Sequence, residues 1–216
     1  ATANTQLQDH PERLRAAALM AQMQVERAEL VDAEKLVNDA LSGYRRSSRE
    51  DSDDAYKARL AQAAVDLFSA GRANLAERRY AAILEHYRAI GQGESDTAIH
   101  AWNNMALAMS GQDRWAEACE QWKQLNLVDR RLYGDDHPYT LETLMDVGTS
   151  LTHLGRLDEA ETVLRETLVI SRKLFPPAHP TLLVNLNNLG GLLLQLNKLD
   201  DAEAIFTEAL ETGRQK

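Results

Sequence analysis

The sequence predicts an all-α protein built from five consecutive helix-turn-helix units, and three observations predict it. Ala and Leu are abundant, while only 5 Pro and 11 Gly occur in 216 residues, a composition that favours long helices with short joints. Apolar residues recur at steps of three and four, the spacing of one face of a helix. Short segments of the chain also recur at a spacing of 42 residues.

The 42-residue repeat is set by landmarks that recur in step. His137-Pro138 returns as His179-Pro180, and the segment 155–160 is repeated at 197–202, 113–118 and 71–76. One additional residue of shift aligns Ala33, and the same shift places His10-Pro11 on His137-Pro138. We therefore expect five units, over residues 9–47, 53–91, 95–134, 137–176 and 179–214.

Each unit contains two apolar-periodic stretches with a polar break between them. In the fourth unit the stretches cover residues 141–154 and 157–175, separated by Gly155-Arg156. Pro138 and Pro180 suit first helical positions, where a missing N–H costs nothing. Asp158 and Glu161 are spaced as in a capping box, with Asp158 in the place of Ser or Thr.

Small residues recur at equivalent positions and predict close packing of the two helices in each unit. A small side chain lets the helix axes approach, and a large apolar partner fills the space beside it. The first helices carry Ala21, Ala64, Ala106, Gly148 and Gly190. The second helices carry Ala33, Ala76, Ala118, Ala160 and Ala202, followed by the large residues Val37, Tyr80, Trp122, Leu164 and Phe206.

At these positions the chain resembles the tetratricopeptide repeat (TPR). The 42-residue period, the His-Pro start and the segment 186–190 are similar to the subclass typified by kinesin light chain. The resemblance implies one array over residues 1–216, wound as a right-handed superhelix (an α-solenoid) with the first helix of each unit on its concave side. No heptad region accompanies the repeats, so the cargo specificity of kinesin light chain does not carry over.

The resemblance also implies which residues line a peptide-binding groove. Asn is useful there because its amide both donates and accepts hydrogen bonds and can clamp a peptide backbone. The alternative for Asn104 and Asn188 is a hydrogen bond between helices, and for His100 and His153 it is a plain surface histidine. The predicted groove residues are His100, Asn103, Asn104, Leu107, Glu142, Met145, Asp146, Thr149, His153, Asn187, Asn188 and Gln195.

The first two repeats contribute little charge to this predicted lining. Arg15 is the only Lys or Arg among the inner positions, so capture of a C-terminal carboxylate is disfavoured and a helix or extended segment fits better. The corresponding positions in these repeats are Arg15, Ala18, Gln22, Glu26, Ala58, Ala61, Val65 and Phe68.

Charge and motif content argue against several other functions. A net charge of −9 without a Lys/Arg cluster disfavours nucleic acid binding, and no apolar run is long enough to span a membrane. Residues 51–54 lack the Gly and Glu that a calcium loop needs downstream, and residues 91–93 lack the third glycine of a dinucleotide loop. We therefore predict no catalytic residues, no metal and no cofactor, and do not expect an enzyme.

We expect a module that binds a protein or peptide partner, because stacked repeats present a long surface. One alternative is a regulatory or sensory region of a larger signalling enzyme, such as a bacterial kinase. Another is self-association as a homodimer, because no later helix covers the apolar side chains of the last helix, Leu199, Ile205, Phe206 and Leu210. The single Cys119, interpreted as a core residue, is compatible with a reducing compartment, and a cytoplasmic location is expected.

Overall fold

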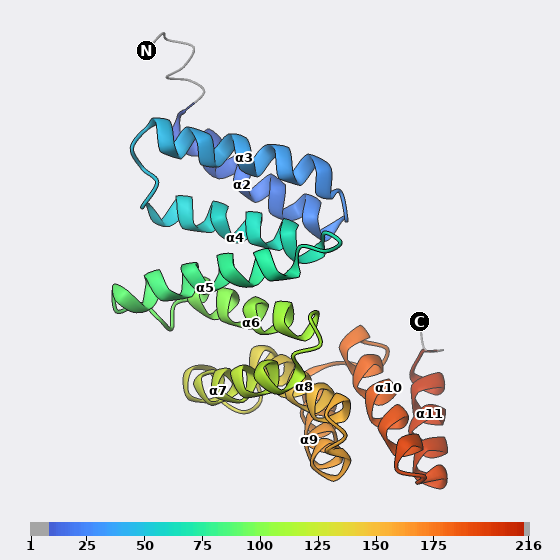
Figure 1. Ribbon diagram of the computed structural model, residues 1–216. Helices are drawn as coiled ribbons and strands as arrows, with labels where there is room; N and C mark the ends of the chain where they lie inside the picture. Colours follow the sequence, from blue (N-terminus) through green and yellow to red (C-terminus); the bar gives the residue numbers. More distant parts are fainter. Residues whose placement is uncertain (1–8, 214–216) are drawn as a thin grey trace. The chain divides into compact units, whose positions relative to one another are not determined.

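The structure is a computed structural model that describes residues 9–213. Its regular secondary structure within this range is entirely α-helical, which confirms the predicted class (Figure 1). Ten helices occur there: α2 (Pro11–Glu26), α3 (Leu30–Arg46), α4 (Asp53–Phe68), α5 (Ala73–Ala89), α6 (Asp96–Ser110), α7 (Trp115–Tyr133), α8 (Pro138–His153), α9 (Leu157–Leu174), α10 (Pro180–Gln195) and α11 (Leu199–Gly213). Taken in pairs, they reproduce the five predicted repeats.

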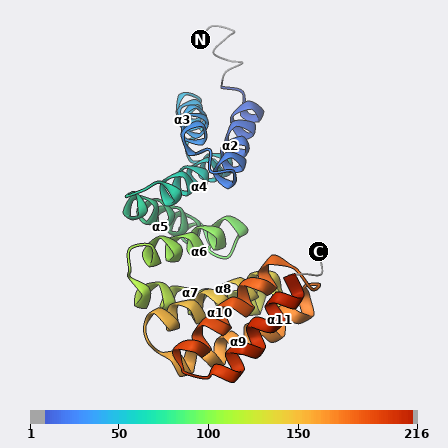
Figure 2. The same cartoon turned by 90° about the vertical axis from the view of Figure 1, so that its right-hand side faces the viewer.

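The chain forms two compact units, residues 1–112 and 113–216. In the first, α2 packs against α3 and α4, α4 packs against α5, and α5 packs against α6. In the second, each of α7 to α10 packs against the next helix in the chain, and Figure 2 shows α8 to α11 side by side. Within each unit, burial therefore comes from helices of the same or the adjacent repeat, as in other repeat proteins.

The turn inside each helix pair contains one residue in the left-handed conformation. These residues are 42 positions apart, except for the first interval, which is one residue longer, and their φ values lie between 56° and 74°. The extra residue confirms the one-residue shift that the sequence requires in the first repeat. Only Gly adopts this conformation without cost, and Asn and Asp tolerate it better than most residues. The five residues are Ala28, Gly71, Asp113, Gly155 and Asn197.

The predicted pairing of small and large residues is found between the helices. A Cβ at Gly190 of α10 would lie 2.7 Å from Cζ of Phe206 in α11, so the ring occupies the space that a side chain at position 190 would need. Gly148 of α8 has the same relationship to Leu164 of α9. The small positions of the second helices are all fully buried: Ala33, Ala76, Ala118, Ala160 and Ala202.

The two His-Pro pairs of the second unit begin helices through a cap made by the imidazole ring. Nδ1 of His137 accepts a hydrogen bond from the backbone N–H of Tyr139 (3.2 Å), and Nδ1 of His179 accepts one from Thr181 (3.3 Å). Pro138 and Pro180 occupy the first helical positions, as predicted. The His side chain therefore takes the role that Ser, Thr, Asp or Asn plays at most helix N-termini.

Arginine–glutamate pairs join the second helices of consecutive repeats in the second unit. Arg130 of α7 binds Glu166 of α9 at 2.7 Å, and Arg172 of α9 binds Glu208 of α11 at 2.6 Å. The two arginines are 42 residues apart in the sequence, and so are the two glutamates. The ion pair is therefore itself a feature of the repeat. It lies on the second helices, which leaves the first helices α8 and α10 to build the candidate site.

Candidate functional site

The predicted groove residues all lie on the first helices of their pairs, and none of them is fully buried. In the first unit, α6 carries His100 and Leu107, which are exposed, and Asn103 and Asn104, which are half-buried. In the second unit, α8 carries the exposed Glu142 and His153 and the half-buried Met145, Asp146 and Thr149, and α10 carries the exposed Asn187 and Gln195 and the half-buried Asn188. The α8 and α10 residues therefore form the set whose geometry can be described together.

A cavity of about 220 Å³ opens between α8 and α10. Five of the predicted groove residues line it: Thr149, His153, Asn187, Asn188 and Gln195. Leu164 and Leu192 add apolar wall, so polar side chains surround an apolar floor. A site of this kind can accept one side chain of a ligand and hydrogen-bond the groups beside it.

Gly191 makes room for this cavity on α10. A Cβ built at Gly191 would meet nothing within 4 Å, whereas one at the neighbouring Gly190 would collide with Phe206. The two adjacent glycines therefore have different structural roles. Gly190 permits the close approach of α11, and Gly191 leaves open space at the cavity wall.

The His153 imidazole is held in place by a stacking contact. Its ring lies 3.7 Å from the ring of Trp115, the first residue of α7, and the two planes differ by only 2°. Trp115 therefore covers one face of the imidazole. His153 is therefore not a free surface histidine, which was the alternative interpretation of this residue.

The amide side chains at the cavity keep their hydrogen-bonding capacity. Asn187, Asn188 and Gln195 make no side-chain hydrogen bond with any other residue in the described part of the chain. The alternative interpretation of Asn188, a hydrogen bond between helices, is therefore not found within residues 9–213. Each amide offers two donors and an acceptor at the mouth of the cavity.

Asp146 lies on α8, one turn before Thr149, and does not line this cavity. Burial, together with the neighbouring carboxylate of Glu142, raises the pKa of Asp146 to about 7. A carboxyl group with a pKa in this range changes charge near neutral pH. The α8 surface therefore carries a charge that depends on pH, close to the polar residues of the cavity.

A second cavity of about 460 Å³ lies between α2 and α4 in the first unit. Three predicted inner positions line it, Arg15, Ala18 and Gln22, but the Arg15 guanidinium is bound to the carboxylate of Asp54 at 2.7 Å and 3.0 Å. The prediction for the second repeat was wrong at three of its four positions; the fourth, Phe68, is 59% exposed. Close packing of α2 on α4 buries its expected inner residues Ala58, Ala61 and Val65 in the core.

Sequence reasoning missed the contacts that do not follow the helical period. Trp115 and His153 are 38 residues apart in neighbouring repeats, and no spacing rule connects them. The histidine caps could have been found from the sequence. An aromatic residue precedes each capping histidine by four positions, and in the structure Tyr133 stacks on His137 and Phe175 on His179.

Residues 9–213 contain neither a metal-binding cluster nor a membrane-spanning helix. No group of three or more His, Cys, Asp or Glu side chains in this range is arranged to hold a metal ion. Of the helices described, none combines the length and apolar character required to cross a membrane.

Comparison with known proteins bears on the repeats directly. The model of the Tetratricopeptide repeat family matches residues 96–173 and again residues 143–215, which together span more than half of the chain. Among curated proteins, no sequence matches this chain.

Solved structures resemble the chain over nearly its whole length. A putative kinesin light chain from Podospora anserina with nearly identical TPR-like repeats has a TM-score of 0.78 at 16% identity, covering 95% of this chain and 97% of that one. BtubC (BKLC) from P. vanneervenii has a TM-score of 0.79 at 20% identity, covering 94% and 82%. A Rap protein complexed with competence and sporulation factor has a TM-score of 0.71 at 11% identity, covering 92% and 53%. These likenesses confirm the predicted fold class, an α-solenoid of helix-turn-helix repeats.

Proposed function

The chain belongs to the tetratricopeptide repeat family, and from this premise we propose that it is a protein-interaction module that binds a peptide or helical segment of a partner. The observation that carries the proposal is the cavity between α8 and α10. Three amide side chains that make no side-chain hydrogen bond within residues 9–213 surround an apolar floor of Leu164 and Leu192.

The dimensions and chemistry of this cavity suggest how the partner is held. A volume of about 220 Å³ suits one apolar side chain rather than a whole small molecule. The amides of Asn187 and Asn188 then hydrogen-bond the backbone on either side of that anchor, which gives affinity with little dependence on the remaining sequence. His153, fixed against Trp115, adds a flat surface at the edge.

One other observation supports a binding role for a fold of this class. The structural neighbour named as a Rap protein is complexed with competence and sporulation factor, so a fold of this class can hold a bound factor. The predicted α6 residues His100, Asn103, Asn104 and Leu107 extend the same proposal to the first unit. We also propose that the repeats form one continuous array over residues 1–216.

Partner capture followed by mass spectrometry tests the proposal. We expect the wild-type chain to retain a partner that the double variant Asn187→Ala/Asn188→Ala binds at least about tenfold more weakly, because two hydrogen bonds are lost. The melting temperature should not change, since neither amide is hydrogen-bonded to another residue in the described part of the chain. Asn74→Ala, an exposed Asn on the second helix α5, is the matched control. Equal retention by the cavity variant and the control would exclude this site.

Self-association is a second candidate function, favoured by the surface of α11. Leu199 and Leu210 are 58% and 63% exposed, although both are large apolar residues. A second copy of the chain could cover them. Light scattering over a concentration series tests this: a dimer that Leu210→Glu dissociates supports it, and a monomer at every concentration excludes it.

A further inference from the structure

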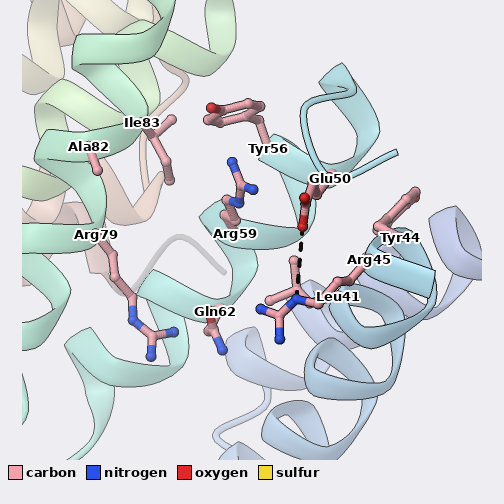
Figure 3. Close-up of a pocket in the computed structure, with 11 residues that line it drawn as sticks. Leu41, Tyr44, Arg45, Glu50, Tyr56, Arg59, Gln62, Arg79, Ala82 and Ile83 are labelled. Atoms are coloured by element: carbon pink, nitrogen blue, oxygen red, sulfur yellow. Dashed lines mark ion pairs between the residues drawn. The ribbon is translucent and has the colours of Figure 1, made fainter. Parts of the chain in front are cut away.

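A cavity of about 300 Å³ in the first unit lies between α3, α4 and α5, away from the first-helix positions that the proposed partner groove uses. Figure 3 shows its lining, with Arg45 coming from α3, Arg59 from α4 and Arg79 from α5. Three arginines therefore line one cavity, although the net charge of the chain is −9. Glu50 is the only carboxylate among the lining residues.

Arg59 is fixed in position but has no anionic partner. Its guanidinium carbon lies 4.3 Å from the centre of the Tyr56 ring, a cation–π contact that holds the charged group over the aromatic face. It forms no ion pair with any residue between 9 and 213. The positive charge at this wall is therefore pre-positioned and uncompensated.

Arg79 lies at another wall of the cavity, but its charge already has a partner within the fold. Its Nε pairs with Asp66 at 3.0 Å, but its Nη1 is buried and has no hydrogen-bond partner within the described chain. Because Nη1 is buried and Nε is paired with Asp66, the Arg79 guanidinium is held within the fold and is not offered to a ligand in the cavity. A ligand at this cavity would therefore bind Arg59, and a negatively charged oxygen is the strongest acceptor for its guanidinium.

Arg45 completes the set at the cavity mouth. It is bound only loosely to Glu50, at 3.9 Å, and its side chain is 82% exposed, so it can turn toward a ligand (Figure 3). The rest of the lining is largely apolar and includes Leu41, Ala55, Ala82 and Ile83. The cavity thus combines donors for an anion with room for an apolar stem.

We propose that this cavity binds a ligand that carries a carboxylate or phosphate group on an aromatic or aliphatic stem. The anion binds the Arg59 guanidinium, toward which the exposed Arg45 can turn, and the stem contacts Ile83 and the neighbouring apolar wall. Guanidinium groups bind both anions in bidentate geometry, so carboxylate and phosphate share this chemistry. The site is independent of the partner groove, and either can be correct without the other.

Backbone amide NMR titration of the full chain tests the proposal with three probes of similar size. Benzoate and phenyl phosphate carry the two anions, and benzamide is the neutral analogue. We expect at least one anionic probe to shift the amide signals of residues around the cavity and benzamide not to do so. The probe that binds more tightly identifies the source of the anion. No shift with either anion, or equal shifts with benzamide, would overturn the proposal.

Three variants locate the binding within the chain. Arg59→Gln should weaken binding about tenfold, because it removes a charge-assisted contact. Arg78→Gln is the matched control, since Arg78 is exposed on the same helix as Arg79 and does not line the cavity. Glu50→Gln should strengthen binding, because it removes the only carboxylate in the lining. This second variant tests the proposal even if Arg59→Gln does not fold. Unchanged affinity in both Arg59→Gln and Glu50→Gln would place the probe elsewhere.

Discussion

Gly148 of α8 and Leu164 of α9 approach so closely that a Cβ at position 148 would lie 2.6 Å from Cδ2 and 2.9 Å from Cγ of the leucine. Leu164 is buried, so the side chains packed around it restrict the movement that would relieve the contact. The equivalent contact of Gly190 with Phe206 involves a ring that is only half-buried. The same repeat position is therefore more constrained in the fourth repeat than in the fifth.

We expect Gly148→Ala to lower the free energy of unfolding by about 1–3 kcal/mol, because the added methyl overpacks the helix pair. Gly190→Ala should cost less, because Phe206 can shift. Urea denaturation measures both. Gly191→Ala is the control, since its Cβ meets nothing within 4 Å and replacing a helical Gly is favourable by about 0.5–1 kcal/mol. Equal destabilisation by all three variants would contradict this account.

His179→Ala should destabilise the second unit by about 0.5–2 kcal/mol, because it removes the cap to the N–H of Thr181 and the stacking contact with Phe175. His179→Asn should recover part of the loss, since Asn is a good N-cap. Thermal denaturation compares these variants. His10→Ala is the matched control, because His10 precedes Pro11 at the start of α2 but makes no side-chain cap. An equal loss in His10→Ala would argue against the cap.

Arg130→Ala should be more destabilising than Arg172→Ala, although the two arginines occupy equivalent repeat positions. Arg172 binds Glu208 at an exposed surface, where an ion pair contributes about 0–1 kcal/mol. Arg130 also donates from Nε to Oδ1 of the buried Asn126, at 2.9 Å, so its removal costs about 1–3 kcal/mol. Denaturation at low and high salt measures both. Salt should reduce the effect of Arg172→Ala and leave most of that of Arg130→Ala.

The features that recur with the repeat were predictable from the sequence, and the contacts that depart from it were not. The positions of Gly148, Gly190 and the buried alanines result from side-chain size recurring every 42 residues, and they are found as expected. The capping box expected at Asp158 and Glu161 does not form, because α9 already begins at Leu157. Instead Arg156, just before the helix, binds Glu159, and Arg114 binds Glu117 in the same way.

The candidate site shows the same division. Five predicted groove residues meet at one cavity, because a fixed helical position repeats on α8 and α10. The stack of Trp115 on His153 could not be predicted, since it depends on where two side chains of neighbouring repeats happen to meet. The burial of Ala58 and Ala61 also departs from the pattern, because small residues there let α2 approach α4.

Asp146 predicts a pH dependence of stability that one substitution removes. Burial and the Glu142 carboxylate raise its pKa from 3.8 to about 7, so between these values the folded chain holds a proton that the unfolded chain has released. The free energy of unfolding therefore falls as the pH rises through this window. Asp146→Asn, which places Asn where the third and fifth repeats carry Asn104 and Asn188, should remove that loss.

We expect wild type and Asp146→Asn to have similar stability at pH 4, and the variant to be more stable by about 1–3 kcal/mol at pH 8. Urea denaturation at several pH values measures the difference. Burial also raises the pKa of Asp129 and Asp66, so these residues add to the pH dependence of stability. Both are present in wild type and in the variant, and the difference between the two proteins at each pH therefore reports Asp146. Glu142→Gln should lower the pKa of Asp146, as read from its carboxyl carbon by NMR. Parallel stability curves for wild type and Asp146→Asn would show that Asp146 does not titrate in this range.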